Sequence, residues 1–269
     1  MEATQQKNRI IYLWPKGAPS SNGLAGVELE DTPNAISNIS KPSLLVYPAS
    51  EPNGKAILMC PGGGFNRISI GHEGRDMAAW FNAQGITYAV LKYRMPNGHR
   101  EVPVDDVRQG LRLLHNNAEE WKITKVGIMG ASVGGYLAAH AAIFETGELR
   151  PDFQILLYPV ISMMPQLTDL NAKTRLLGEN PTKEDEKKYS LELHVTPHTP
   201  PAFIALTSDD ETINPENSLL YYLVLLKNKV SVSLHIYPKG GHSFGFRDSF
   251  IFKRQWTDEL EKWLGAIEP

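Results

Sequence analysis

The sequence predicts an α/β fold in which a mostly parallel sheet of about eight strands is covered by helices on both faces. Short apolar, β-branched runs alternate with longer segments of helical periodicity along most of the 269 residues. Several of these runs, such as ILLY and FIAL, are apolar almost throughout, which is typical of strands buried on both faces. With 42% hydrophobic and 21% charged residues, the composition is that of a globular protein. We expect a single domain over residues 1–269.

The strands are expected in runs that are rich in apolar and β-branched residues. They cover residues 43–47, 55–60, 87–91, 125–129, 153–158, 202–207 and 231–237. The segments that alternate with them have helical patterns; in one of them, Val104, Val107, Leu111 and Leu114 recur at helical spacing. Helices are expected at residues 72–84, 104–118, 132–144, 215–228 and 251–267. This alternation predicts parallel strands joined by helical crossovers.

One segment, residues 166–200, departs from the alternation. It is polar, contains ENPTKEDEKK and ends in TPHTPP. Such a short segment is too small to support a sizeable core of its own. We therefore expect an excursion that carries short helices and shapes the entrance to a site.

Composition excludes several classes of function. The net charge is −3 and the basic residues are scattered, so nothing indicates a nucleic-acid or anionic membrane surface. A single cysteine, Cys60, excludes an intrachain disulfide and a multi-cysteine zinc site, and the histidines have no metal-ligand spacing. No run reaches the length of a membrane helix. The start, MEATQQKNRI, has no secretory segment; the expected location is secreted or periplasmic if a leader was removed, and cytoplasmic if Met1 is native. Oligomeric state is not indicated.

The strongest local pattern is G-x-S-x-G, centred on Ser132 in VGIMGASVGGYLAAHAA, residues 126–142. It follows an apolar run and opens an alanine-rich segment, which places the serine on a strand-to-helix turn. A nucleophile on such a turn has strained backbone angles, so the residues two before and two after it must be small, which Gly130 and Gly134 are. The helix N-terminus adds free N–H groups beside the serine oxygen. The alternative, a plain N-cap serine, is less favoured in this context.

A serine hydroxyl needs a base to become a nucleophile. Proteins with this pattern carry serine, acid and histidine in that chain order. Only His235 and His242 lie far enough downstream. His235 is inside the strand run VSLHIY and is expected to be structural, whereas His242 lies in the glycine-rich KGGHSFGF, where a base is expected. His140, on the helix after Ser132, is expected in the core.

The acid should come from a strand end between nucleophile and base. The stretch FIALTSDDETINPENS offers three adjacent acids, Asp209, Asp210 and Glu211, directly after a strand. Periodicity does not resolve them, so at this point all three remain candidates.

The run CPGGGF, residues 60–65, follows the apolar stretch AILM. It lacks the G-x-G-x-x-G spacing of a dinucleotide site and the G-K-[ST] of a P-loop. Glycines at a strand end instead fit an oxyanion hole, where backbone N–H groups approach a reacting oxygen with no side chain between. Cys60 is expected to be the end of a buried strand.

Together these motifs resemble those of an α/β-hydrolase of the carboxylesterase type, similar to the acetylxylan-esterase-like and hormone-sensitive-lipase-like branches. The segments that carry the resemblance span nearly the whole chain in the expected order. They are IYLWPKGAP (11–19), PGGGF (61–65), KYRMP (92–96), GASVGG (130–135), SDDETINPENS (208–218) and GGHSFG (240–245).

The resemblance implies site residues beyond those read from the patterns. The family's acid stands three residues before an aliphatic residue, which fits Asp210 with Ile213. Its glycine loop implies Gly63 and Gly64 as oxyanion donors, together with Val133 after the nucleophile. The loop differs from many relatives in having proline at position 61, where they have a histidine outside the triad.

The resulting hypothesis is a serine carboxylesterase for short-chain acyl esters, which deacetylates xylan or acetylated sugars through Ser132, His242, Asp210 and an acyl-enzyme. No cofactor is implied, and the partner is a small-molecule or oligosaccharide ester substrate. Two alternatives remain: a serine peptidase acting on short peptides, and a catalytically silent binding protein on the same scaffold.

Aromatic residues flank the motifs. Phe65, Tyr136, Phe244 and Phe246 are candidates for the wall of the substrate pocket, although aromatic side chains at such positions are also common in the core.

Overall fold

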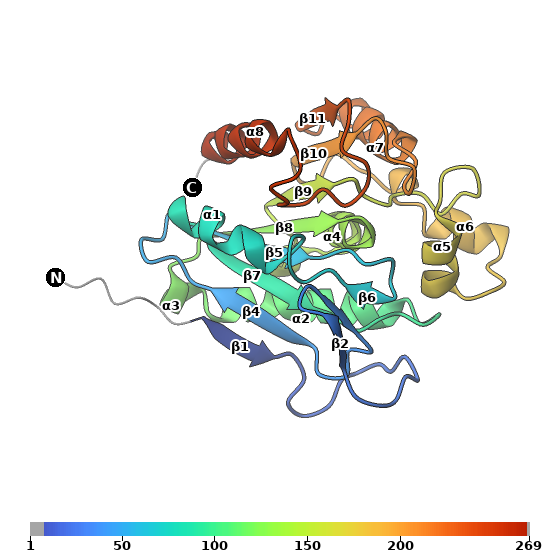
Figure 1. The fold of residues 1–269 in the computed structure, drawn as a ribbon, viewed down its shortest axis with the longest axis horizontal. Helices are drawn as coiled ribbons and strands as arrows, with labels where there is room; N and C mark the ends of the chain where they lie inside the picture. Colours follow the sequence, from blue (N-terminus) through green and yellow to red (C-terminus); the bar gives the residue numbers. More distant parts are fainter. Residues whose placement is uncertain (1–7, 268–269) are drawn as a thin grey trace.

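The computed structural model describes residues 8–267. A central sheet of eight strands runs through the molecule in the order β1-β4-β7-β5-β8-β9-β10-β11 (Figure 1). The strands are β1 Arg9–Tyr12, β4 Ser43–Tyr47, β7 Thr87–Lys92, β5 Lys55–Cys60, β8 Lys125–Ala131, β9 Phe153–Leu157, β10 Ala202–Thr207 and β11 Val232–Tyr237. β4 is antiparallel to β1 and β7, and all neighbours from β7 to β11 are parallel. The predicted mostly parallel sheet is confirmed.

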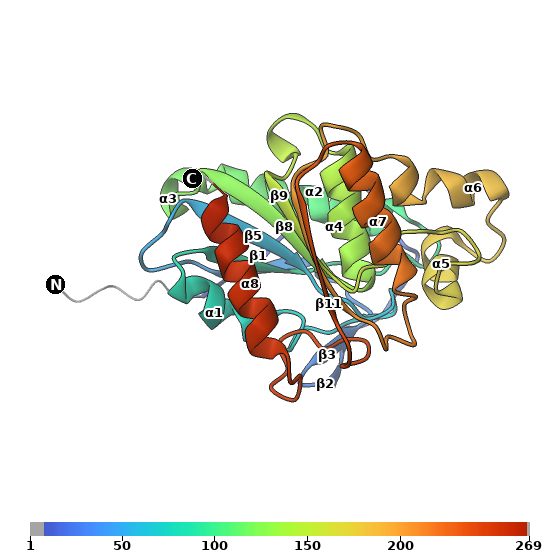
Figure 2. The ribbon, with the colours of Figure 1, turned by 90° about the horizontal axis from the view of Figure 1, so that it is seen from above.

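Helices cover both faces of this sheet. Figure 2 shows α1 and α8 on one face and α2, α4 and α7 on the other. The α-helices are α1 Ala78–Ala83, α2 Glu101–Asn116, α3 Ala118–Trp121, α4 Val133–Phe144, α5 Leu170–Leu177, α6 Lys183–Lys188, α7 Glu216–Lys227 and α8 Lys253–Ala266; short 3₁₀ turns are η1 Arg75–Met77, η2 Gly147–Leu149 and η3 Leu191–Leu193. The excursion at residues 166–200 contains α5, α6 and η3, so the short helices expected there are present.

Four short strands were not predicted: β1, and β2 Leu29–Thr32, β3 Ala35–Ser37 and β6 Arg67–Ile68, which form a separate small sheet in the order β2-β3-β6. Every residue of β2 is exposed, and its sequence LEDT contains no apolar run, whereas β1, RIIY, is apolar but lies mostly exposed at the edge of the sheet. The expectation about a leader concerns the start of the chain, of which residues 1–7 lie outside the described part.

Two predicted helices have different bounds. The helix expected from residue 72 begins only at η1 and α1, because residues 71–74 form a turn that brings Glu73 into the interior. The helix expected at residues 104–118 starts earlier, at Glu101, and is interrupted at Asn117 before α3. Pro103 does not obstruct the early start, because it lies in the first turn, where its missing N–H has no helical acceptor.

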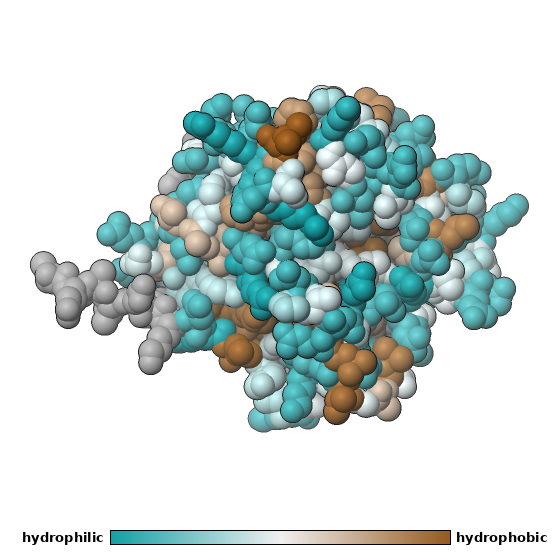
Figure 3. Space-filling model, viewed as in Figure 1, coloured by the Kyte–Doolittle hydropathy of each residue, from teal (hydrophilic) through white to brown (hydrophobic). Residues whose placement is uncertain are grey.

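The core is centred on the middle of the sheet. Every residue of β5, β9 and β10 is buried, whereas every residue of the edge strands β1 and β11 is at least partly exposed. The face seen in Figure 3 is largely hydrophilic, with separate small hydrophobic patches. No helix within residues 8–267 has both the length and the apolar character needed to cross a bilayer.

Candidate active site

Ser132 stands between β8 and α4 in a conformation that few residues adopt. Its φ is 54° and its ψ is −122°, and such strain persists only where the surroundings enforce it. A Cβ on Gly130 would collide with the carbonyl oxygen of Gly134, and one on Gly134 with that of Cys60. The glycines of the G-x-S-x-G pattern are therefore required by backbone packing, and the predicted sharp turn is present.

His242 and Asp210 reach Ser132 from the loops that follow two other strands. His242 follows β11 and Asp210 follows β10. The Nε2 atom of His242 lies 2.9 Å from the Oγ atom of Ser132, and its Nδ1 atom lies 2.7 Å from the Oδ2 atom of Asp210. The other carboxylate oxygen of Asp210 accepts from the N–H groups of Thr212 and Ile213, both at 2.9 Å. The three side chains form one hydrogen-bonded row, and both oxygens of Asp210 are occupied.

The three adjacent acids have different positions. Asp209 is exposed, and its carboxylate accepts from the N–H groups of Gly240 and Gly241 at 3.2 and 2.8 Å. These two hydrogen bonds lower the pKa of Asp209, and the bond from Gly241 has the larger effect. Glu211 is exposed. Only Asp210 contacts His242, while Asp209 fixes the loop that carries it.

The glycine loop after β5 lies beside Ser132. Gly63, Gly64 and Val133 line a cavity of about 390 Å³ together with Ser132 and His242. No backbone hydrogen bond among residues 8–267 uses the N–H of Gly63 or Gly64 as donor. Val133 is the first residue of α4, where an N–H has no helical acceptor. Three unpaired N–H groups therefore border the cavity that holds the serine hydroxyl.

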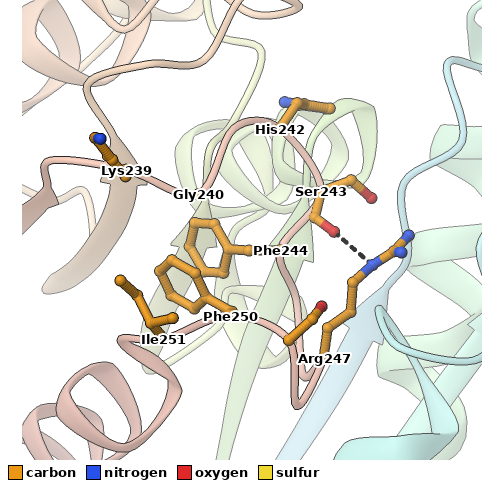
Figure 4. A pocket seen from close by; sticks show the side chains of 9 residues that line it. Lys239, Gly240, His242, Ser243, Phe244, Arg247, Phe250 and Ile251 are labelled. Carbon is orange, nitrogen blue, oxygen red and sulfur yellow. Dashed lines mark hydrogen bonds between the residues drawn. The ribbon is translucent and has the colours of Figure 1, made fainter.

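The aromatic residues predicted to form the pocket wall do not line this cavity. Phe65, Tyr136 and Phe244 are each at most 2% exposed, and Phe65 packs edge-on against Tyr136. Figure 4 shows Phe244 and Phe250 stacked on one side of the loop, with His242 projecting to the other. Because Phe65, Tyr136 and Phe244 are buried, their rings belong to the core behind the site.

Comparison with known proteins agrees with the fold described above. Residues 57–246 match the family model of the alpha/beta hydrolase fold. The chain belongs to the α/β-hydrolase family. It is 38% identical to an acetylxylan esterase of Xylanibacter ruminicola over 238 residues, 86% of this chain and 50% of that protein. It is 32% identical to endo-1,4-beta-xylanase B of Butyrivibrio fibrisolvens over 213 residues, 73% of this chain and 33% of that protein. The chain thus spans half or less of the curated relatives it matches.

Solved structures match over more of their length. The acetyl ester-xyloside bifunctional hydrolase of Caldicellulosiruptor lactoaceticus has a TM-score of 0.81 and 31% identity, with 96% of each chain covered. A sugar hydrolase of Lactococcus lactis has a TM-score of 0.72 and 29% identity, covering 86% of this chain and 96% of that one. The fold predicted for this α/β hydrolase is therefore shown by its relatives as well as by its own sheet order.

A buried carboxylate beneath the site was not predicted. Glu73 is 1% exposed and lines the cavity of this α/β hydrolase. Its Oε2 atom accepts from the N–H of Gly62 at 3.0 Å, and its Oε1 atom accepts from the hydroxyls of Tyr158 at 2.9 Å and Ser243 at 2.7 Å. Glu73 thus joins the glycine loop to the loop that carries His242. In the sequence it lies in a helical pattern, which gave no reason to separate it from surface acids.

Removing the Glu73 carboxylate should loosen both loops. In Glu73→Ala, two buried donors (the Gly62 N–H and the Tyr158 hydroxyl) and one partly buried donor (the Ser243 hydroxyl) lose this acceptor, which we expect to cost about 3–5 kcal/mol in the free energy of unfolding and to lower kcat. Glu73→Gln keeps an oxygen for Gly62, and its amide can donate to the two hydroxyls. It should therefore retain more of the stability and more of the kcat than Glu73→Ala. Denaturant unfolding and ester hydrolysis measure the two effects. Equal behaviour of the two variants would contradict the proposed joining role.

The remaining cavity wall is polar. Arg67, Asn66 and Ser69 follow the glycine loop, and α5 with its N-cap supplies Asp169, Ala172 and Arg175. Arg175 donates from Nη1 to the carbonyl oxygen of Gly64 at 2.7 Å. Within residues 8–267, no three His, Cys, Asp or Glu side chains gather as a metal ion would require.

The two other histidines considered above lie away from Ser132. His235 stacks on Phe203 and hydrogen-bonds the hydroxyl of Ser233 at 2.7 Å. His140 packs between the rings of Tyr136 and Phe144, where burial lowers its pKa to about 4. Both positions agree with a structural role.

Proposed function

We propose that this α/β hydrolase is a serine carboxylesterase that releases short acyl groups, acetyl above all, from xylan or related sugars. The observation that carries the proposal is the row Asp210–His242–Ser132, which opens into a polar cavity bordered by unpaired N–H groups. The acetylxylan esterase and the acetyl ester-xyloside hydrolase among its relatives support the choice of acyl group and of sugar.

In this proposal the Oγ atom of Ser132 attacks the ester carbonyl carbon while Nε2 of His242 takes the hydroxyl proton. Asp210 holds the Nδ1–H tautomer and stabilises the imidazolium that forms. The negative oxygen of the tetrahedral intermediate accepts from the N–H groups of Gly63, Gly64 and Val133. His242 then gives its proton to the leaving alcohol oxygen, and the acyl-enzyme remains.

The second half of the reaction reuses the same groups. A water molecule loses a proton to His242 and attacks the acyl carbon, and collapse of the second tetrahedral intermediate returns the proton to Ser132 and releases the carboxylic acid. The helix α5 contributes one wall of the cavity. This supports the proposal that residues 166–200 shape the entrance.

A substrate panel tests the proposal. We expect kcat/KM to fall at least about tenfold from p-nitrophenyl acetate through butyrate to octanoate, because few apolar side chains line the cavity to receive a long chain. Acetylated xylo-oligosaccharides should be deacetylated. Octanoate as the best substrate would contradict the acyl class. A dipeptide p-nitroanilide hydrolysed faster than any ester would favour the peptidase alternative.

A further inference from the structure

A second cavity adjoins the one that holds Ser132. It has a volume of about 620 Å³ and shares Arg67, Ser69 and Ser243 with the first cavity of about 390 Å³. The two therefore meet along a common edge formed by these three residues.

One wall of the second cavity is the hairpin of β2 and β3, which supplies Thr32, Asn34 and Ala35. The hairpin is attached to the active-site loop, because β3 pairs with β6, where Ser37 lies opposite Arg67. Its tip is also held, since Arg75 donates to the carbonyl oxygen of Pro33. This wall is thus anchored on both sides, and it lies outside residues 57–246, which match the family model.

The chemistry of the second cavity fits a neutral polyhydroxylated ligand. Its charged side chains balance, with Arg67 and Arg247 against Asp76 and Asp248. Burial lowers the pKa of His72, which favours its neutral form. The lining offers many donors and acceptors and no net charge for an anion, and its apolar side chains are Phe246 and Ala35.

We propose that the second cavity binds the sugar unit next to the acetylated one, so that acetylated oligosaccharides are preferred over an acetylated monosaccharide. This inference rests on the proposed esterase function and adds to it a direction: the sugar chain runs from Ser132 past Arg67 toward the β2–β3 hairpin. Arg67 is exposed and lines both cavities, so in this proposal it lies between the two sugar units.

A third cavity, of about 400 Å³, is a less suitable continuation. It shares only His242 and Ser243 with the first cavity, and it is lined by Phe244, Phe250 and Ile251. Figure 4 shows that these side chains lie on the side of the loop away from the His242 ring. Arg67 and Ser69, which the first cavity shares with the second and not with the third, therefore favour the second cavity.

The test compares kcat/KM for acetylated xylotriose with that for acetylated xylose. We expect the wild-type ratio to favour xylotriose by about tenfold or more. Ala35→Trp and, independently, Thr32→Trp place a large ring on the hairpin wall and should bring the ratio close to one. Glu30→Trp is the matched control, because Glu30 is exposed on the same hairpin and lines neither cavity, so the ratio should remain.

The outcomes separate this inference from the function on which it rests. A wild-type enzyme that hydrolyses p-nitrophenyl acetate but has a ratio near one overturns the second sugar site and leaves the esterase function intact. A ratio that is lost in Ile251→Trp and kept in both hairpin variants assigns the sugar to the third cavity and also overturns the proposal. Absence of hydrolysis of every ester contradicts the esterase function itself.

Discussion

Replacing Ser132 with alanine is expected to lower kcat for p-nitrophenyl acetate by about four orders of magnitude or more. Among residues 8–267, the hydrogen-bond partner of His242 Nε2 is the Oγ atom of Ser132 at 2.9 Å, which the variant lacks, so no acyl-enzyme can form. The stability should change by less than about 1 kcal/mol, because only this one side-chain hydrogen bond is lost. Steady-state hydrolysis and thermal unfolding measure the two effects.

A fluorophosphonate probe provides the control for this prediction. The probe should label the wild type but not Ser132→Ala. It should also label Ser21→Ala, in which the changed serine is exposed and distant in sequence from Ser132. Turnover that persists at the wild-type rate in Ser132→Ala would require another nucleophile. Cys60 could not supply it, because it is completely buried and burial raises its pKa, which keeps the thiol protonated.

Replacing Asp210 with asparagine should lower kcat by about 10³–10⁴, while Asp209→Asn should lower it by less than about tenfold. The Asp210 carboxylate accepts from Nδ1 of His242 at 2.7 Å and from two backbone N–H groups, so an amide there cannot hold the required tautomer and stabilise the imidazolium. The Asp209 carboxylate instead accepts from the N–H groups of Gly240 and Gly241. An asparagine oxygen can retain part of that contact.

The pair of adjacent variants is a sharp comparison, because the two changes have the same size and charge. The ratio of their kcat values, measured for both variants at the same pH, gives the difference. Losses of equal size, or a larger loss in Asp209→Asn, would contradict the assignment of Asp210 to the base.

The sequence predicted those parts of the site in which the backbone leaves little choice. Ser132 was found because its strained turn requires Gly130 and Gly134, and this requirement is visible as a pattern. His242 was found because a glycine-rich loop after the last strand contrasts with His235 inside that strand. Periodicity did not separate Asp210 from Asp209, and the choice came from the family's spacing.

Other features could not be predicted, because they depend on contacts between distant segments. Glu73 is recognisable only once Gly62, Tyr158 and Ser243 are seen to converge on it. The prediction that Phe65 lines the pocket did not foresee its burial in the core. Strands such as β2 are exposed throughout, so their pairing leaves no hydrophobic signal in the sequence.

The direct backbone contact between the Ser132 turn and the loop after β5 has an evolutionary consequence. A Cβ on Gly134 would collide with the carbonyl oxygen of Cys60, and one on Gly62 would lie 2.9 Å from the Cβ atom of Ser132. Ser132 and the loop beside it are therefore held close together by packing at the glycines. Substitutions of the side chains that line the cavities can change which ester is accepted without moving Ser132 or the loop after β5. Substrate selectivity can therefore diverge among related proteins that keep the same chemistry.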